Sequence, residues 1–415
     1  MTLTHTHWLP ALAMAASALP AHLHTCRDAS MTNKAPVSVQ HTVLVPVPRE
    51  PEYTPTEPVG ENTPAANPPP AEQTLDGTVE AMDIWGRLRS GFDLPQAVGS
   101  SVQAQIEHFH NHPRHVEHIL RRGEPYLYYI LNRVAERGLP AELALLPVIE
   151  SAFDPFSRSP AGAAGIWQFM PATARQVGLR RDWWFDGRRD IVAATEAALD
   201  YLGALRQRFD GDWLLALAAY NAGSARVNRA MRLNRSRGKP VDFWHLPLPE
   251  ETRSYVPKLL ALRAIISSPE AHNITLPAVV NIHYFSAVDI DGPLDLQVAA
   301  RLTGAPVEEL MRLNPGLIRS ITPPASPHTL LIPTASEQRF REQLARLPAD
   351  QRVQSVKYRV RKGDTLSAIA QNSRTTVTRL RQINQLESTR IFAGKLLIVP
   401  LGERDENAGG ELQAS

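Results

Sequence analysis

Hydrophobic positions over residues 80–270 recur at helical spacing, and they predict one all-α domain. Asp190, a residue type that caps helix N-termini, precedes one apolar stripe, and Asp212 precedes a second run that closes at Gly223, a common helix stop. The first stripe consists of Ile191, Ala194, Ala198, Leu202 and Leu205. We find no alternating run of apolar and polar residues in this region that would indicate a strand.

An internal repeat occupies the C-terminal third, with copies at residues 279–335 and 355–402. At one constant offset, Leu296, Ala300, Leu310, Leu313 and Asn314 return as Leu366, Ala370, Leu380, Ile383 and Asn384. An alternating segment opens the second copy at Tyr358, and each copy ends in an apolar run and a proline. A constant offset argues for duplicated units. We therefore expect a mainly α fold: an all-α domain followed by two small α+β modules, each strand, helix, helix, strand.

The segments outside these domains are predominantly polar or rich in proline. Residues 27–79 contain many prolines and few apolar residues, so they are expected to form a disordered linker that gives the folded part reach. Residues 336–354, between the repeats, predict a polar linker helix, and residues 403–415 a disordered tail.

The first 26 residues indicate the cellular compartment in which the protein acts. Residues 8–21 are apolar and close in length to a signal-peptide core, although no Lys or Arg precedes them. Cys26 follows Leu23-His24-Thr25, which resembles a lipoprotein cleavage site only at the leucine. We expect export to the periplasm, with Cys26 as a candidate point of outer-membrane attachment. The alternative is an unpaired cysteine in a mobile tail.

Composition narrows the function classes. The 415 residues carry a formal net charge of +2, so no strong positive field indicates nucleic-acid binding. A single cysteine excludes a disulfide framework and a thiolate metal cluster. A run of five histidines between His108 and His118 has helical spacings, but Pro113 interrupts it and no carboxylate cluster accompanies it. We expect a solvated helix entry there and no metal site.

Glu150 ends the segment that carries the strongest chemical signal. From Pro140, a residue suited to the first turn of a helix, the chain continues as a helix that is apolar on every side and therefore buried. A carboxyl group in such surroundings is desolvated and responds with a raised pKa. A carboxylic acid that stays protonated near neutral pH can protonate a glycosidic oxygen. On this segment alone, a buried Glu paired with an unseen Arg is the favoured explanation.

Three further segments follow Glu150-Ser151-Ala152-Phe153 in order. They are Ser159-Pro160-Ala161-Gly162-Ala163-Ala164-Gly165-Ile166-Trp167-Gln168-Phe169-Met170-Pro171-Ala172-Thr173-Ala174, Ala219-Tyr220-Asn221-Ala222-Gly223 and Glu251-Thr252-Arg253-Ser254-Tyr255-Val256-Pro257. Together, over roughly residues 95–265, the four segments resemble the goose-lysozyme-like lytic transglycosylases, and among them the membrane-bound lytic murein transglycosylase D type. The resemblance implies a lysozyme-like fold and cleavage of peptidoglycan glycan strands.

The resemblance also implies a role for each matching residue. Glu150 matches the family's catalytic acid, whereas the other matches are expected to line the substrate cleft: Ser159, Gln168, Met170, Tyr220, Asn221 and Tyr255. Structural alternatives stay open: Met170 as a core residue, Asn221 as a helix C-cap beside Gly223, and the two tyrosines as core aromatics.

Asp154 is the obvious candidate for a second carboxylate, which glycoside hydrolases generally need. It precedes Pro155, which disfavours helical geometry at residue 154, so we expect Asp154 to organise a turn. A single acid fits a transglycosylase, in which Glu150 first donates a proton to the leaving oxygen and then accepts one from the sugar's own 6-hydroxyl. No water is consumed, and no cofactor is expected.

The two repeats resemble LysM modules, which bind glycans that contain N-acetylglucosamine. In the second copy, Gly363, Asp364, Thr365 and Asn384 match the pattern and are the expected glycan-binding residues. The first copy lacks the Gly-Asp-Thr start, so packing without a ligand is an equal alternative for it.

The preferred interpretation is an exported, monomeric lytic transglycosylase that makes 1,6-anhydro ends at the MurNAc-GlcNAc bond and is held on peptidoglycan by its repeats. Two rivals stay open. One is a lysozyme-type muramidase on the same fold, which would release reducing ends instead, and the other is a non-catalytic peptidoglycan-binding scaffold.

Overall fold

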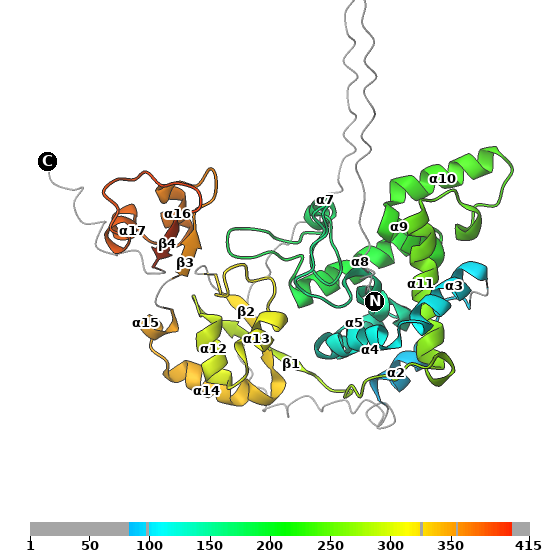
Figure 1. Cartoon of the computed structure of the whole chain (residues 1–415), viewed down its shortest axis with the longest axis horizontal. Helices are drawn as coiled ribbons and strands as arrows, with labels where there is room; N and C mark the ends of the chain where they lie inside the picture. The colour runs from blue at the N-terminus through cyan, green and yellow to red at the C-terminus, as the bar shows by residue number, and fades with distance from the viewer. Residues whose placement is uncertain (1–82, 97–98, 324–326, 354–355, 401–415) are drawn as a thin grey trace, which may run out of the picture. The chain divides into compact units, whose positions relative to one another are not determined.

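The computed structural model describes residues 83–96, 99–323, 327–353 and 356–400. Within this part the mainly α fold is confirmed: a helical domain is followed by two small modules, each with one two-stranded antiparallel sheet (Figure 1). The predicted signal segment 1–26, the linker 27–79 and the tail 403–415 lie outside the described residues. None of the described helices is both long enough and apolar enough to cross a membrane.

The helical domain is built from helices that begin and end close to the predicted signals. They are α2 (Ile84–Ser90), α3 (Ser100–His110), α4 (Pro113–Arg122), α5 (Glu124–Glu136), α6 (Leu146–Ser151), α7 (Pro171–Gln176), α8 (Ile191–Arg208), α9 (Trp213–Ala222), α10 (Ser224–Ser236) and α11 (Glu250–Ser267), with 3-10 turns η1 (Ala141–Leu145), η2 (Phe243–His245) and η3 (Glu270–His272). Asp190 and Asp212 are confirmed as N-caps of α8 and α9, because their carboxylates accept hydrogen bonds from backbone N–H groups one turn later.

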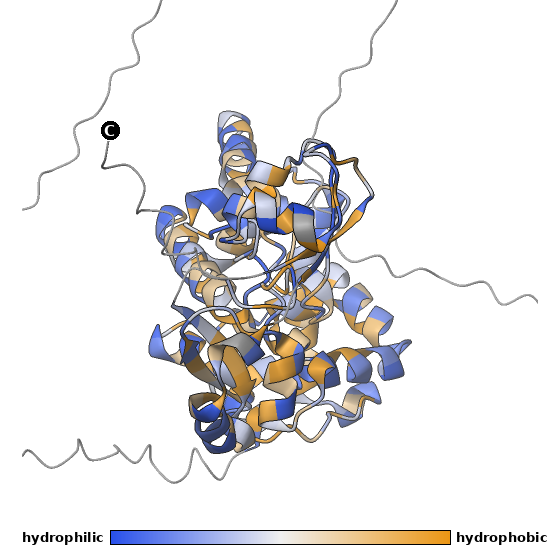
Figure 2. Cartoon of the chain, turned by 90° about the vertical axis from the view of Figure 1, so that its left-hand side faces the viewer, coloured by the Kyte–Doolittle hydropathy of each residue, from blue (hydrophilic) through white to orange (hydrophobic). Residues whose placement is uncertain are grey.

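Helix α9 lies at the centre of the domain, packed against α8, α10 and α11. All its residues but Asn221 are apolar, and Trp213 and the run from Leu215 to Ala219 are buried, as expected of a helix packed against several others. Hydrophobic and hydrophilic residues follow one another along the helices of the chain (Figure 2). Helix α4 buries only Val116, Ile119 and Leu120, and α10 only Val227, Ala230 and Asn234, so each packs on one side.

The segment from Pro140 to Ser151 is divided where we predicted one helix. A 3-10 turn, η1, leads into the short helix α6, and every residue of both elements is buried. Pro147 explains the division: it has no backbone N–H to donate to the carbonyl of Leu143, so a continuous α-helix would lose that hydrogen bond.

Each C-terminal module has the predicted strand, helix, helix, strand order. The first contains β1 (Phe285–Ile290), α12 (Leu296–Thr303), α13 (Val307–Leu313) and β2 (His328–Pro333), and the second contains β3 (Val356–Arg359), α16 (Leu366–Asn372), α17 (Val377–Ile383) and β4 (Leu396–Val399). Strand β1 pairs with β2, and β3 pairs with β4, both antiparallel.

One repeated asparagine joins helix to strand in both modules. The amide nitrogen of Asn314 donates to the carbonyl oxygens of Leu310 and Leu331, and its amide oxygen accepts from the Leu331 N–H. Asn384 makes the same three bonds, to Leu380 and Ile398. The repeat seen in the sequence therefore corresponds to a shared structural connection.

The segment predicted as a linker helix packs as part of the first module. Two helices form there, α14 (Glu337–Arg346) and α15 (Ala349–Arg352), after the 3-10 turn η4 (Thr334–Ser336). Phe340 is fully buried in the same hydrophobic cluster as Leu302 and Leu310, and α14 lies against α12. This packing buries the single apolar face of α14.

An aromatic loop joins the helical domain to the first module. Trp184 and Phe185 belong to the module's hydrophobic cluster, and the Trp184 carbonyl accepts a hydrogen bond of 2.8 Å from the Ile318 N–H. The Asp186 N–H donates to the Gly316 carbonyl at 2.9 Å. The first module is therefore fastened to the helical domain through backbone as well as side chains.

Candidate active site

Glu150 lies in the last turn of α6 and is 6% exposed. Glu150 follows the apolar segment that begins at Leu143. Ala152 caps the C-terminal end of α6 in a left-handed conformation with φ of 52°. A carboxyl group in this position is largely removed from water.

The Tyr255 hydroxyl donates a hydrogen bond of 2.5 Å to Oε1 of Glu150, from a tyrosine that is itself 2% exposed on α11. Burial raises the pKa of Glu150 to about 8, against the lowering effect of the Tyr255 bond; Glu251 raises it further and Lys258 lowers it. The group is therefore predominantly protonated at neutral pH, and its second oxygen is not held by Tyr255.

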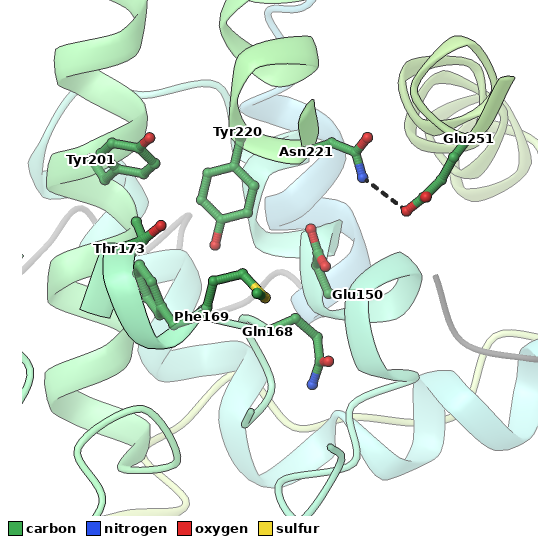
Figure 3. A pocket seen from close by; sticks show the side chains of 9 residues that line it. Glu150, Gln168, Phe169, Thr173, Tyr201, Tyr220, Asn221 and Glu251 are labelled. Carbon is green, nitrogen blue, oxygen red and sulfur yellow. Dashed lines mark hydrogen bonds between the residues drawn. The ribbon is translucent and has the colours of Figure 1, made fainter. Parts of the chain in front are cut away.

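A pocket opens in front of this carboxyl group (Figure 3). Its lining side chains come from α6, α7, α8, α9 and α11 and the loop before α7: Glu150, Gln168, Phe169, Met170, Thr173, Tyr201, Tyr220, Asn221 and Glu251. The pocket is open to solvent and has a volume of about 450 Å³. Four predicted cleft residues are thus brought together with Glu150, and Tyr255 supports the acid from behind.

Gln168 owes its position to a tight turn after Gly165. Its φ is 47°, and its amide nitrogen donates to the Gly165 carbonyl at 2.8 Å. Gly165 has φ of 81°, and a Cβ there would lie 2.0 Å from the Arg188 carbonyl oxygen, so only glycine fits. Arg188 in turn makes a buried ion pair of 2.7 Å with Asp186 and donates to the Gly162 carbonyl. The turn is therefore held from behind by a fixed charge pair.

Tyr220 is fixed by the neighbouring motif. Its hydroxyl donates to the Trp167 carbonyl at 3.0 Å, and its ring lies within aromatic contact distance of Phe169 and Tyr201. Burial, followed by the charge of Glu150, raises the pKa of Tyr220 well above its usual value. The hydroxyl remains protonated, and it points toward the pocket in front of Glu150 (Figure 3).

Asn221 connects α9 to α11. Its amide oxygen accepts from the Thr252 hydroxyl at 2.8 Å, and its amide nitrogen lies 3.5 Å from Oε1 of Glu251, at the limit of a hydrogen bond (Figure 3). The C-cap of α9 is Gly223. Asn221 is therefore a helix residue that faces the pocket.

Met170 is the N-cap of α7, half-buried, and it lines the pocket. Ser159 is not among the lining residues; its hydroxyl accepts from the Ala163 N–H at 3.0 Å and so organises the turn before Gly165. Asp154 likewise stands in a turn, where it accepts from the Phe156 N–H at 3.0 Å, and it does not line the pocket.

Sequence reasoning missed the carboxylate that does line the pocket with Glu150. Glu251 opens the fourth motif one helical turn before Tyr255, so helical spacing placed both on one face of α11. Tyr201 lines the pocket from α8, and no signal in its surroundings distinguished it from the apolar stripe beside it.

The predicted glycan-binding residues of the second module have identifiable structural contacts. Thr365 caps α16, Asp364 accepts from the Tyr358 hydroxyl and the Arg361 N–H, and Gly363 has φ of 94°. Their glycan contacts stay a prediction. For the histidine run, the described residues contain no group of three or more His, Cys, Asp or Glu side chains that could hold a metal ion.

Three family models match the chain. The Transglycosylase SLT domain matches residues 128–243, the LysM-like domain of the lytic transglycosylase MltD matches residues 284–349, and the LysM domain matches residues 358–400. The first range contains Glu150 and the pocket residues up to Asn221.

Similar curated proteins come from several sources. The membrane-bound lytic murein transglycosylase D of Escherichia coli (strain K12) is 37% identical over 339 residues, which cover 79% of this chain and 75% of that protein. A putative tributyltin chloride resistance protein of Alteromonas sp. (strain M-1) is 39% identical over 170 residues, 41% of this chain and 80% of that protein. The peptidoglycan transglycosylase gp16 of Escherichia phage T7 is 39% identical over 112 residues, 27% of this chain and 8% of that protein.

Proposed function

Because the chain belongs to the membrane-bound lytic murein transglycosylase D family, we propose that it cuts the MurNAc-GlcNAc β-1,4 bond of peptidoglycan with Glu150 as the single acid and base. One observation carries the proposal: a carboxyl group with a pKa of about 8 faces a pocket while Tyr255 holds one of its oxygens.

The reaction divides into two proton transfers through Oε2 of Glu150. In the first, the protonated acid gives its proton to the glycosidic oxygen as the bond from that oxygen to C1 of MurNAc breaks. In the second, the resulting carboxylate takes the proton of the MurNAc 6-hydroxyl while that oxygen bonds to C1. The anhydro ring closes, the acid is restored, and no water is consumed.

The surrounding side chains support these steps. The Tyr255 hydrogen bond stabilises the carboxylate that exists between the two transfers, because a hydroxyl donates more strongly to a charged oxygen than to a neutral one. Glu251 favours the protonated ground state by charge repulsion. The Tyr220 hydroxyl and the Gln168 amide contribute polar groups to the pocket wall for the sugar hydroxyls and N-acetyl groups.

A muramidase on the same fold is the second candidate, and Glu251 is the observation that favours it. A hydrolase needs a second carboxylate to act as nucleophile or to activate water, and Glu251 lines the pocket with Glu150. The Asn221 amide restrains Glu251 from one side. If Glu251→Gln lost as much activity as Glu150→Gln in an equally stable protein, the hydrolase would be favoured.

We propose that the two C-terminal modules hold the enzyme on peptidoglycan, that it acts in the periplasm as a monomer, and that Cys26 is its outer-membrane attachment. The second module matches the LysM domain model, which supports its binding to peptidoglycan. The attachment is tested by labelled fatty-acid incorporation into the full chain and into Cys26→Ser; equal labelling of both would remove Cys26 from the proposal.

A further inference from the structure

A second cavity, open to solvent and of about 980 Å³, lies between the loop that follows α13 of the first module and strand β3 of the second. Five of its lining side chains are cationic: Arg319, Lys357, Arg359, Arg361 and Lys362. No Asp or Glu of the described residues lines it. The charge is local, because the whole chain carries only +2.

Arg319 is the most constrained of these cations. Its guanidinium carbon lies 4.0 Å from the ring centroid of Trp183 and 5.1 Å from that of Tyr358, so two aromatic faces fix it. Its Nη1 atom is buried and has no hydrogen-bond partner among the described residues. Burial lowers the pKa of Arg319 to about 10. A desolvated guanidinium nitrogen without an acceptor is costly, and an anion entering the cavity would supply the acceptor.

The other four cations are exposed on or beside strand β3, and none forms an ion pair within the described chain. Arg359 donates to the Gly394 carbonyl at 3.0 Å. The nearby carboxylate of Asp364 accepts from the Tyr358 hydroxyl and from the Arg361 backbone N–H. Asp364 partly offsets the charge of Arg319, but the five cations of the cavity lining outnumber this neighbouring carboxylate.

We propose that this cavity binds the free carboxylate groups of the peptide side chains of peptidoglycan. The inference rests on the proposed function, because it takes peptidoglycan as the ligand's source. The repeating sugars of an intact strand carry uncharged N-acetyl groups, and its negative charge lies on the attached peptides. Guanidinium groups match carboxylates in two-pronged geometry. The module would then recognise peptide-bearing strands, in addition to the sugar.

The test uses the full chain with Glu150→Gln, so that binding is measured without cutting. Binding isotherms compare intact sacculi with sacculi whose free carboxyl groups have been converted to carboxamides. We expect intact sacculi to bind about tenfold tighter, as one or two charge-assisted hydrogen bonds would give. Lys357→Gln, Arg361→Gln and Lys362→Gln together should abolish that difference. The matched control removes three charges of the same module outside the cavity lining, Arg374→Gln, Arg379→Gln and Arg390→Gln, and should keep it.

A competition experiment tests the same proposal without a cavity variant. Free stem tetrapeptide should displace the protein from intact sacculi and leave its binding to amidated sacculi unchanged. Equal affinity for both kinds of sacculi would overturn the proposal, as would an equal loss in the cavity and control variants. Phosphatidylglycerol vesicles form the last arm. Cavity-dependent vesicle binding without carboxylate discrimination on sacculi would assign the cavity to lipid phosphate. Because cutting plays no part, these outcomes are independent of whether wild-type products are anhydro sugars.

Discussion

The pocket around Glu150 and the cavity around Arg319 both contain ionisable side chains, but they differ in whether those side chains carry charge. The pocket lies among packed helices and keeps a carboxyl group protonated by desolvation. The cavity lies beside the two-stranded sheet of the second module and is lined by five cationic side chains. A raised carboxyl pKa requires desolvation by packed side chains, whereas exposed cations can bind an anion on a small scaffold. Chemistry and attachment can therefore be lost separately.

The largest expected effect comes from a substitution in the pocket that should abolish turnover without affecting binding. Glu150→Gln keeps the side chain's size and removes its titrating proton. Turnover of sacculi should fall by at least about a thousandfold, as for removal of an essential general acid with no substitute. Sacculus binding and the melting temperature at pH 6 should not fall. Activity within about tenfold of wild type would contradict the assignment of Glu150 as the acid.

The same variant should also reveal the cost of burying the acid. The folded-state pKa of Glu150, about 8, lies above its usual 4.5. Protonation therefore contributes stability that is fully present below pH 4.5 and is lost as pH rises through 8. Glu150→Gln removes this loss, so its melting temperature should exceed that of wild type at pH 9. Equal pH dependence of melting would show that the carboxyl group is not desolvated.

Tyr255→Phe should have the second effect in size. It removes the hydrogen bond that stabilises the Glu150 carboxylate, so the pKa of Glu150 should rise further and the basic limb of the pH–rate profile should move to higher pH. The limiting rate should fall by about 10–100-fold, the range for a hydrogen bond to a charged group. A merely structural tyrosine would lower the rate without moving the limb. An unmoved limb would therefore remove Tyr255 from the mechanism.

Deletion of residues 354–415 removes the second module and tests whether it contributes to sacculus binding without contributing to turnover. The deletion starts after Val353, because Arg352 donates to the Asp291 carbonyl and Val353 is buried in the first module. Apparent affinity for sacculi should fall by about 10–100-fold through loss of local concentration. The pocket loses no lining residue, so rates on short soluble glycans should stay within about twofold of full-length. Undiminished sacculus binding would place the wall affinity elsewhere, in the extended cleft or the first module.

The smallest effect compares the two repeats. Asn314→Ala and Asn384→Ala each remove two hydrogen bonds that join a helix end to a strand. Each should cost about 1–3 kcal/mol, since backbone groups lose their partners. In the first module Asn314 is 5% exposed and the module is fastened to the helical domain, so its loss should lower the main melting transition. Asn384→Ala should weaken sacculus binding only where it melts the second module; weakened binding by a protein that melts normally would instead make Asn384 a direct glycan ligand.

Much of this division could be read from the sequence. Helix caps at Asp190 and Asp212, the repeat and the buried position of Glu150 all follow from local periodicity, which reports burial directly. The four motifs identified Gln168, Tyr220 and Asn221, and the structure brings all three to one pocket.

The remainder depends on contacts between distant segments. Nothing near Trp184 indicates that it packs into a module more than a hundred residues later, and nothing near Arg319 indicates that it lies over Trp183. Ser159 shares a motif with Gln168 yet makes a turn, because which residues of a loop face inward is set by the bend at Gly165. Helix α14 looked like a linker because only its Phe340 face is apolar, and one face is enough for packing.

The most direct test of a single-acid mechanism is mass analysis of the muropeptides that the wild-type protein releases from purified sacculi, with Glu150→Gln as the blank. The account predicts products that end in 1,6-anhydro-MurNAc, lighter by one water than the hydrolysis products, and no incorporation of ¹⁸O when the digest is run in labelled water. Reducing MurNAc ends that carry ¹⁸O would contradict it, because they require an activated water and therefore a second catalytic carboxylate in the pocket.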